Sequence, residues 1–180
     1  MNQGLADFIR AKIDLIGKKD FIELYRTMNR SLSPKDVGSI TEFFLDLDIN
    51  PLFYMENVPE DFAYESGIKS IIIPDNINKI GNEAFASCAE LERVVIGNNT
   101  TNIGAWAFRN CNSLTSVDIP GSVEDIGYSA FGNCERLTSI RYVGSKEEWN
   151  SIDKSNDWDK NTGDYTVHCT DGDIHKGETL

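Results

Sequence analysis

The chain of 180 residues lacks several features that would point to common functional classes. It has no stretch of 18 consecutive apolar residues, so the sequence holds no candidate for a membrane-spanning helix. Histidine is scarce, and the sequence supports no Ser-His or Cys-His pair of the kind used in nucleophilic catalysis. No glycine-rich loop stands between a strand and a helix to hold phosphate. We therefore do not expect an enzyme.

The N-terminal sequence does not have the composition of a secretory signal peptide. Its apolar stretch, MNQGLADFIRAKIDLIG, contains the acids Asp7 and Asp14, whereas a signal peptide has an uninterrupted apolar centre behind a basic start. On this ground we expect a cytoplasmic protein.

Negative charge is in excess and unevenly placed. The net charge is −12, with 12 acids against 7 bases in residues 1–65, 8 against 6 in residues 66–142, and 9 against 4 in residues 143–180. Such a chain repels nucleic acid and anionic membranes and attracts basic protein surfaces, although acidity also serves solubility. The candidate acidic patch consists of Glu147, Glu148, Asp153 and Asp157.

A unit of 23 residues repeats through the middle of the chain. Its copies read PDNINKIGNEAFASCAELERVVI from Pro74, GNNTTNIGAWAFRNCNSLTSVDI from Gly97 and PGSVEDIGYSAFGNCERLTSIRY from Pro120. A period this short indicates a solenoid, whose rungs bury their apolar side chains against one another. Four columns keep the same residue: Ile80, Ile103 and Ile126; Phe85, Phe108 and Phe131; Cys88, Cys111 and Cys134; Leu91, Leu114 and Leu137.

Each rung is predicted to hold one short strand, because apolar residues recur at close intervals in LERVVI, LTSVDI and LTSIRY. The Ala-Phe pair should fill the opposite wall of the core. The Ile-Gly pair should mark a turn where two backbones approach closely. About four such rungs, stacked roughly 4.8 Å apart, give a core about 20 Å long that needs a cap at each end.

These residues resemble the BspA-like leucine-rich repeat family of bacteria, whose unit reads approximately IP.sV..Ig..aF..c..L..i.i. An incomplete unit, VPEDFAYESGIKSIII, precedes the three copies and places Phe62 one period before Phe85. In this alignment Glu65 falls in the cysteine column and Asp61 in the alanine column. YVGSKEEWNSI and YTVHCTDGD resemble the segment that closes arrays of this family, so the similarity covers roughly residues 58–175.

The first third of the chain has helical periodicity instead. Apolar spacing predicts helices over residues 4–16 and 19–30, and a third that begins at Pro34, after Ser33 as N-cap, and runs to about Leu47. These helices form a cap on the open end of the solenoid, or they also carry a binding surface. The expected fold is α+β, a short leucine-rich-repeat solenoid, with residues 1–50 as helical cap or binding module, 51–142 as repeats and 143–180 as C-terminal cap and acidic tail.

Three of the four cysteines share one column of the repeat. We expect Cys88, Cys111 and Cys134 to be buried thiols that act as small apolar residues, although the rung spacing would also permit a bridge between neighbours.

Neither a metal nor another cofactor is expected. Cys169, His168 and His175 lack the paired spacing of a zinc site. The segment DWDKNTGD, residues 157–164, is similar to the start of a calcium loop, but Thr162 stands where that loop requires glycine.

With catalysis disfavoured, the sequence predicts a module that binds a protein partner through the outward strand residues and the helical cap. A second hypothesis is a phage-type, anti-CRISPR-like inhibitor whose acidic surface blocks the basic channel of a nucleic-acid-handling protein. A third is a fragment of a surface adhesin. The candidate partner-binding residues are Lys69, Ile72, Glu92, Arg93, Val95, Thr115, Asp118, Thr138 and Arg141.

Overall fold

A computed structural model of the protein describes residues 33–46 and 49–178, together with Ala11, Gly17 and Asp20. Apart from Ala11 and Asp20, the helices expected over residues 4–16 and 19–30 lie outside the described residues. Within the described part, no helix is long and apolar enough to cross a lipid bilayer.

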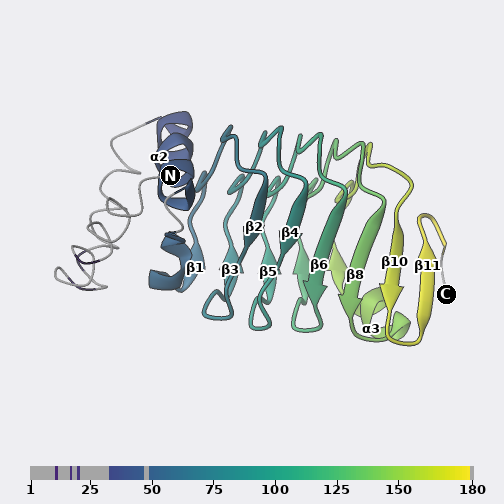
Figure 1. Ribbon diagram of the computed structural model, residues 1–180. Coiled ribbons are helices and arrows are strands. Elements are labelled where there is room, and N and C mark those ends of the chain that lie inside the picture. The colour runs from purple at the N-terminus through teal and green to yellow at the C-terminus, as the bar shows by residue number, and fades with distance from the viewer. Residues whose placement is uncertain (1–10, 12–16, 18–19, 21–32, 47–48, 179–180) are drawn as a thin grey trace.

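Two sheets form the walls of a β-solenoid (Figure 1), and all their strand pairs are parallel except β10 with β11, which is antiparallel. The six strands of the long sheet are, in chain order, β2 (Ser70–Ile72), β4 (Arg93–Val95), β6 (Ser116–Pro120), β8 (Ser139–Val143), β10 (Thr166–Cys169) and β11 (Gly172–His175). The five strands of the short sheet are β1 (Asn57–Val58), β3 (Lys79–Ile80), β5 (Asn102–Ile103), β7 (Asp125–Ile126) and β9 (Asp153–Lys154). The predicted solenoid is confirmed, and each rung adds a second, two-residue strand that the sequence did not predict.

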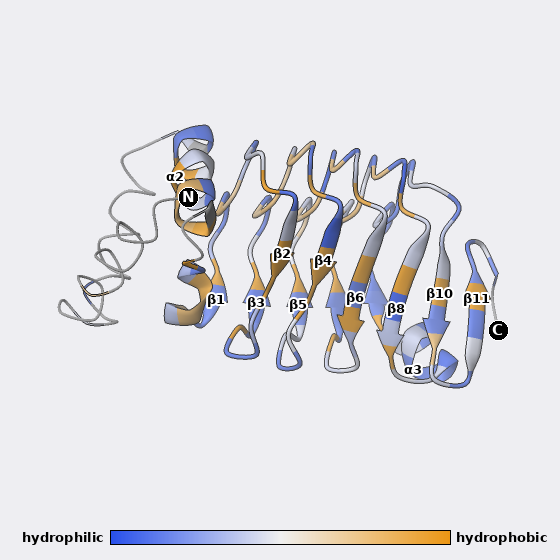
Figure 2. Cartoon of the chain, viewed as in Figure 1, coloured by the Kyte–Doolittle hydropathy of each residue, from blue (hydrophilic) through white to orange (hydrophobic). Residues whose placement is uncertain are grey.

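The core consists of columns in which each side chain packs on its counterpart in the next rung. Hydrophobic and hydrophilic residues alternate along β6 and β8 (Figure 2), and buried residues alternate with more exposed ones in β2 and β4 as well, so one face of each of these strands is buried. On the opposite wall, the ring of Phe108 stacks on those of Phe85 and Phe131, with centroids 5.1 Å and 5.2 Å away. All three rings are fully buried, as the repeat predicted.

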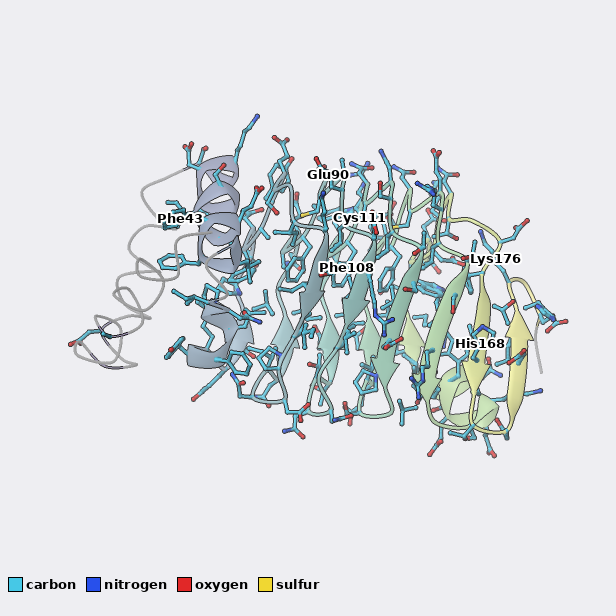
Figure 3. All side chains as sticks on the ribbon, viewed as in Figure 1. Phe43, Glu90, Phe108, Cys111, His168 and Lys176 are labelled. Carbon is cyan, nitrogen blue, oxygen red and sulfur yellow. The ribbon has the colours of Figure 1, made fainter. Side chains whose placement is uncertain are left out.

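The cysteine column follows the phenylalanine column by three residues in each repeat, and Figure 3 labels Phe108 and Cys111 of the central repeat. Cys88, Cys111 and Cys134 are buried free thiols, and each Sγ donates to a backbone carbonyl of the preceding rung, at 2.9 Å, 3.2 Å and 3.1 Å respectively. The predicted core thiols are confirmed. Burial raises the pKa of Cys111 well above its usual range, which keeps this thiol protonated.

The Ile-Gly pairs mark the predicted close approach of neighbouring backbones. A Cβ on Gly104 would lie 2.7 Å from the carbonyl carbon of Gly81, and one on Gly127 would lie 2.5 Å from the backbone nitrogen of Ala105. No real Cβ tolerates such distances, so only glycine fits at this turn.

The first rung corrects the alignment expected from the sequence. Val58 pairs with Ile80, an offset of 22 residues, whereas Ile71 pairs with Val94, an offset of 23. The first rung is therefore one residue shorter between its two strands than the three repeats that follow it.

This shortening changes which residues occupy the columns of the first rung. Ser66, not Glu65, lies in the cysteine column, with its Oγ 3.4 Å from the Sγ of the next rung, while Glu65 is exposed. Backbone pairing places Phe62 in the alanine column instead of Asp61. Its ring still meets that of Phe85, edge-on at 5.7 Å.

Residues 143–178 add a fifth rung, one more than the four expected from the repeat. Strand β9 pairs with β7, and β10 pairs with β8, both in parallel. The backbone nitrogen of Phe131 donates to the carbonyl of Trp158 at 2.8 Å, as that of Phe108 donates to Ala130. Trp158 thus occupies the alanine column, and its ring covers Phe131 edge-on at 6.1 Å.

At the other end, helix α2 (Pro34–Asp46) and the 3-10 helix η1 (Pro51–Tyr54) cover the first rung (Figure 1). The Ser33 Oγ accepts a hydrogen bond from the Asp36 backbone nitrogen at 3.3 Å, which confirms the predicted N-cap. The buried Thr41 hydroxyl donates to the carbonyl of Phe62 at 2.6 Å. Asn76 in turn donates to two carbonyls of the η1 segment, at 2.8 Å and 2.6 Å.

Candidate functional site

The outward side of the long sheet, here called the sheet face, carries five of the nine predicted partner-binding residues: Ile72, Arg93, Val95, Asp118 and Arg141. The other four directly precede the strands. All nine are exposed or half-buried, while Ile71, Val94, Val117 and Ile140 between them are buried. These nine are Lys69, Ile72, Glu92, Arg93, Val95, Thr115, Asp118, Thr138 and Arg141.

One row of the sheet face divides into an apolar half and a charged half. Strand register aligns Ile72 with Val95, and then continues through Asp118 and Arg141 to His168 on β10. Figure 3 shows His168 toward the C-terminal end of the sheet. A partner that crosses the strands along this row meets apolar side chains first and charges afterwards.

A hollow of about 480 Å³ runs along this row and is lined by Ile72 and Val95 of the apolar half as well as by Asp118 and Arg141 of the charged half. Phe53, Ile72 and Val143, which are 61%, 63% and 56% exposed, all line it. They are three of only five large apolar side chains that the described residues expose strongly. Exposed apolar side chains that gather around one concavity are typical of binding surfaces.

A second hollow, of about 450 Å³, adjoins the first. Phe53 and Ile72 line both hollows, so they form the ridge between them. The remaining walls of the second hollow come from Leu45 of α2, from the segment around Asn50 and from the edge of β2. The Asn50 amide donates to the Ile72 carbonyl at 2.9 Å, which fixes the η1 segment beside the sheet edge.

Residues of the charged half take part in two close pairs of side chains with opposite charge character, and one cation there has no carboxylate partner among the described residues. Arg93 donates to Asp118 at 2.7 Å across neighbouring strands. His168 lies 3.0 Å from Asp173. Arg141 is exposed and forms no ion pair within the part of the chain that the structure describes.

Two of the predicted site residues also stabilise the stack. The Thr115 hydroxyl donates to the Glu92 carbonyl at 3.1 Å, and the Thr138 hydroxyl donates to the Thr115 carbonyl at 3.4 Å. Each bond links one rung to the next, so these threonines have a structural role whether or not they contact a partner.

The predicted acidic patch is spread over three elements away from the sheet face. Glu147 and Glu148 lie on α3 (Lys146–Ser151), where Glu148 forms a capping box with Ser145. Asp153 belongs to β9. Asp157 lies in the turn of the fifth rung and pairs with Lys160 at 3.2 Å.

The segments considered for metals have other roles in the described structure. The carboxylate of Asp159 accepts a hydrogen bond from the Tyr165 hydroxyl at 2.7 Å, and burial together with this bond raises the pKa of Tyr165. Among the described residues, no group of three or more His, Cys, Asp or Glu side chains is placed to hold a metal ion.

Sequence reasoning missed Phe53, Val143 and His168 as residues of the sheet face or its hollow. Val143 and His168 continue strand alternation beyond the last repeat, which is a signal the sequence contains. Phe53 carries no such signal, because only the packing of η1 beside β2 brings it to the hollow.

Comparison with known proteins gives one family match. A family model described as BspA type leucine rich repeat region, with 6 copies, matches residues 56–155. No curated protein matches the chain. The 1.80 Å crystal structure of a leucine rich cell surface protein from Faecalibacterium prausnitzii A2-165 is 24% identical, with a TM-score of 0.28. The match covers 49% of this chain and 35% of that one, so it spans about a third of that protein's length.

Proposed function

Since the chain belongs to the BspA-type leucine-rich repeat family, whose model matches residues 56–155, we propose that it is a non-catalytic module that binds a protein partner through the sheet face. The observation that carries the proposal is the hollow of that face, where the exposed apolar side chains of Phe53, Ile72 and Val143 gather beside Asp118 and Arg141. The N-terminal cap takes part, because η1 supplies Phe53.

The two halves of the face have different roles in this proposal. An apolar side chain of the partner fills the hollow and displaces water from Ile72 and Phe53, which provides most of the affinity. Arg141, which has no ion-pair partner within the described residues, orients the partner by pairing with one of its carboxylates. The strands of the repeats offer roughly 500–800 Å², at the low end for a stable interface, so the cap must contribute to the contact.

The test compares partner capture by the parent protein and by variants of the ridge. Ile72→Ser and Phe53→Ser should reduce the recovery of a specific partner from host lysate, measured by quantitative mass spectrometry. The control is Phe43→Ser, which removes a similarly exposed aromatic side chain of α2 outside both hollows. Circular dichroism checks that all three variants remain folded. Equal recovery by the parent and the two ridge variants would refute the role of the hollow.

The inhibitor hypothesis makes a different prediction for the same partner. If the acids attract a basic nucleic-acid-handling protein, association should slow steeply between low and physiological salt. Changing Glu147, Glu148, Asp153 and Asp157 to Lys should then slow association more than it speeds dissociation. A partner that binds independently of salt would refute this hypothesis and leave the apolar hollow as the site. The adhesin hypothesis stays a prediction, and so does a cytoplasmic location.

A further inference from the structure

A pair of partly exposed aromatic rings lies beside the short sheet, on residues that the sheet face does not include. Trp106 follows β5 and Tyr128 follows β7. Their rings meet edge-on, with centroids 5.8 Å apart and planes at 87°. Tyr128 is 43% exposed, and Trp106 is half-buried. A backbone bond of 2.9 Å from Trp106 to the Tyr128 carbonyl fixes the pair on two central rungs.

Trp106 occupies a position where the other rungs carry small or acidic residues. Its φ of 56° lies in the left-handed region, as do those of its counterparts. A bulky residue with positive φ is uncommon, and half-burial gives the indole little core packing in return. The counterparts in the other four rungs are Asp61, Glu83, Ser129 and Asp157.

Carboxylates flank the aromatic pair on its N-terminal side. Asp61 and Glu83 lie in the same column as Trp106, in the two preceding rungs. The pKa of Asp61 is raised by burial and by electrostatic repulsion from Glu83 and Glu60. These three carboxylates are therefore close enough to repel one another. Neither Asp61 nor Glu83 forms an ion pair with a cation in the described part of the chain.

The outward row of the adjacent short sheet extends this negative surface. Asp125 and Asp153 are register partners on β7 and β9, and both side chains point outward. Only Lys79 of β3 places a cation in the same row. Stacked like charges are unfavourable in a sheet, so a cation supplied from outside would relieve this repulsion.

We propose that Trp106 and Tyr128 form a docking platform for an arginine side chain of a partner protein, with Asp61 and Glu83 supplying the complementary charge. An arginine guanidinium is planar and stacks on aromatic faces while its N–H groups reach a carboxylate. The net charge of −12 attracts an arginine-containing segment of a partner toward this protein. This surface is separate from the sheet face, and the proposal does not depend on the function proposed for that face.

The test uses a hexa-arginine peptide as the probe and hexacitrulline as its neutral, nearly isosteric control. Protein labelled with ¹⁵N at its three tryptophans is titrated at low salt, and the indole N–H signals are followed by NMR. The arginine peptide should shift the Trp106 signal and leave that of the buried Trp149 in place. Hexacitrulline should leave both in place.

Variants separate stacking from general attraction. Tyr128→Leu and Trp106→Asn should each weaken binding of the arginine peptide about three- to fivefold, as measured by calorimetry. Asparagine suits a positive φ, so Trp106→Asn should fold. Glu83→Gln should also weaken binding, whereas Ile72→Ser on the sheet face should not.

Four results would overturn the proposal. The first is an unmoved Trp106 signal while the peptide binds, and the second is an equal shift with hexacitrulline. The third is unchanged affinity in both aromatic variants, which would mean that charge alone attracts the peptide. The fourth is equal affinity of the parent for hexalysine, which would show that the platform does not select arginine.

Discussion

At the scale of single residues, the central phenylalanine is the side chain on which the stack depends most directly. Phe108 is fully buried between two other rings. Truncation to alanine would leave a cavity that the rigid rungs on either side cannot close. Phe108→Ala should therefore lower the free energy of unfolding by about 3–5 kcal/mol, measured by urea denaturation. Val143→Ala, at an exposed site, is the control and should change it little. A parent-like midpoint for Phe108→Ala would contradict the rung assignment.

Asp61 should make the stability depend on pH. The pKa of Asp61 in the folded protein is raised above 3.8, the ordinary value that applies to the unfolded chain. At a pH between the unfolded and the folded pKa, the folded state therefore binds more protons than the unfolded state. Stability therefore falls as the pH rises through this window. Asp61→Asn removes the charge, so it should stabilise the protein at pH 7, with a gain that shrinks toward pH 4.

Urea denaturation of parent and variant at both pH values measures this difference. Asp164→Asn, at an exposed aspartate before β10, should change stability little at either pH. If Asp61→Asn raised the free energy of unfolding equally at both pH values, the cause would be the better fit of asparagine to the positive φ at this position, and not the loss of charge.

At the scale of the repeated element, each rung turns by placing two non-glycine residues in the left-handed region. The ten residues with positive φ fall into two columns that run through all five rungs. In the second column, side-chain amides link successive rungs: Asn161 donates to Asn133 at 2.9 Å, and Asn133 donates to Asn110 at 2.7 Å. This ladder offsets part of the cost of the backbone conformation.

Glu83 tests the conformational free-energy cost of a positive φ in the first of these columns, which consists of Asp61, Glu83, Trp106, Ser129 and Asp157. Its φ of 54° disfavours any residue with a Cβ. Glu83→Gly should therefore raise the free energy of unfolding by about 1 kcal/mol. The matched control is Glu92→Gly, next to β4 and outside the left-handed region, which should instead destabilise the protein. Urea denaturation measures both changes, and the prediction fails if the two substitutions change the free energy of unfolding in the same direction.

At the scale of the whole molecule, both ends of the solenoid are closed by an aromatic ring in the alanine column. Phe62 and Trp158 both lie edge-on to the phenylalanine stack, whereas the inner rings are stacked. Helix α2 then covers one end, and the β10–β11 hairpin extends the long sheet at the other. These closures keep the end rungs of a short stack out of water.

Removal of the fifth rung should therefore damage the whole array. A chain that stops after Tyr142 leaves Phe131 without Trp158, and Tyr142 without the ring of Trp149, now 5.3 Å away. We expect a lower urea midpoint, a shallower transition and association in size-exclusion chromatography. A chain trimmed after residue 178 is the control. A monomer with the parent midpoint would show that residues 143–178 are dispensable for folding.

The sequence by itself determined what depends on local spacing. The 23-residue period placed the phenylalanine, cysteine and isoleucine columns in the core, because identical residues at one interval must stack. Strand alternation likewise placed Ile72, Asp118 and Arg141 on the outward face. Capping chemistry located the start of the helix at Pro34.

Only the tertiary structure decided features that depend on which distant segments stack. The one-residue shortening of the first rung leaves no trace in its composition, so alignment by period misplaced Phe62. The fifth rung carries no repeated residue, yet β9 and β10 pair because Trp158 fills the space that the open end would expose to water. The hollow of the sheet face, likewise, exists because hydrogen bonds from Asn50 and Asn76 hold Phe53 beside Ile72.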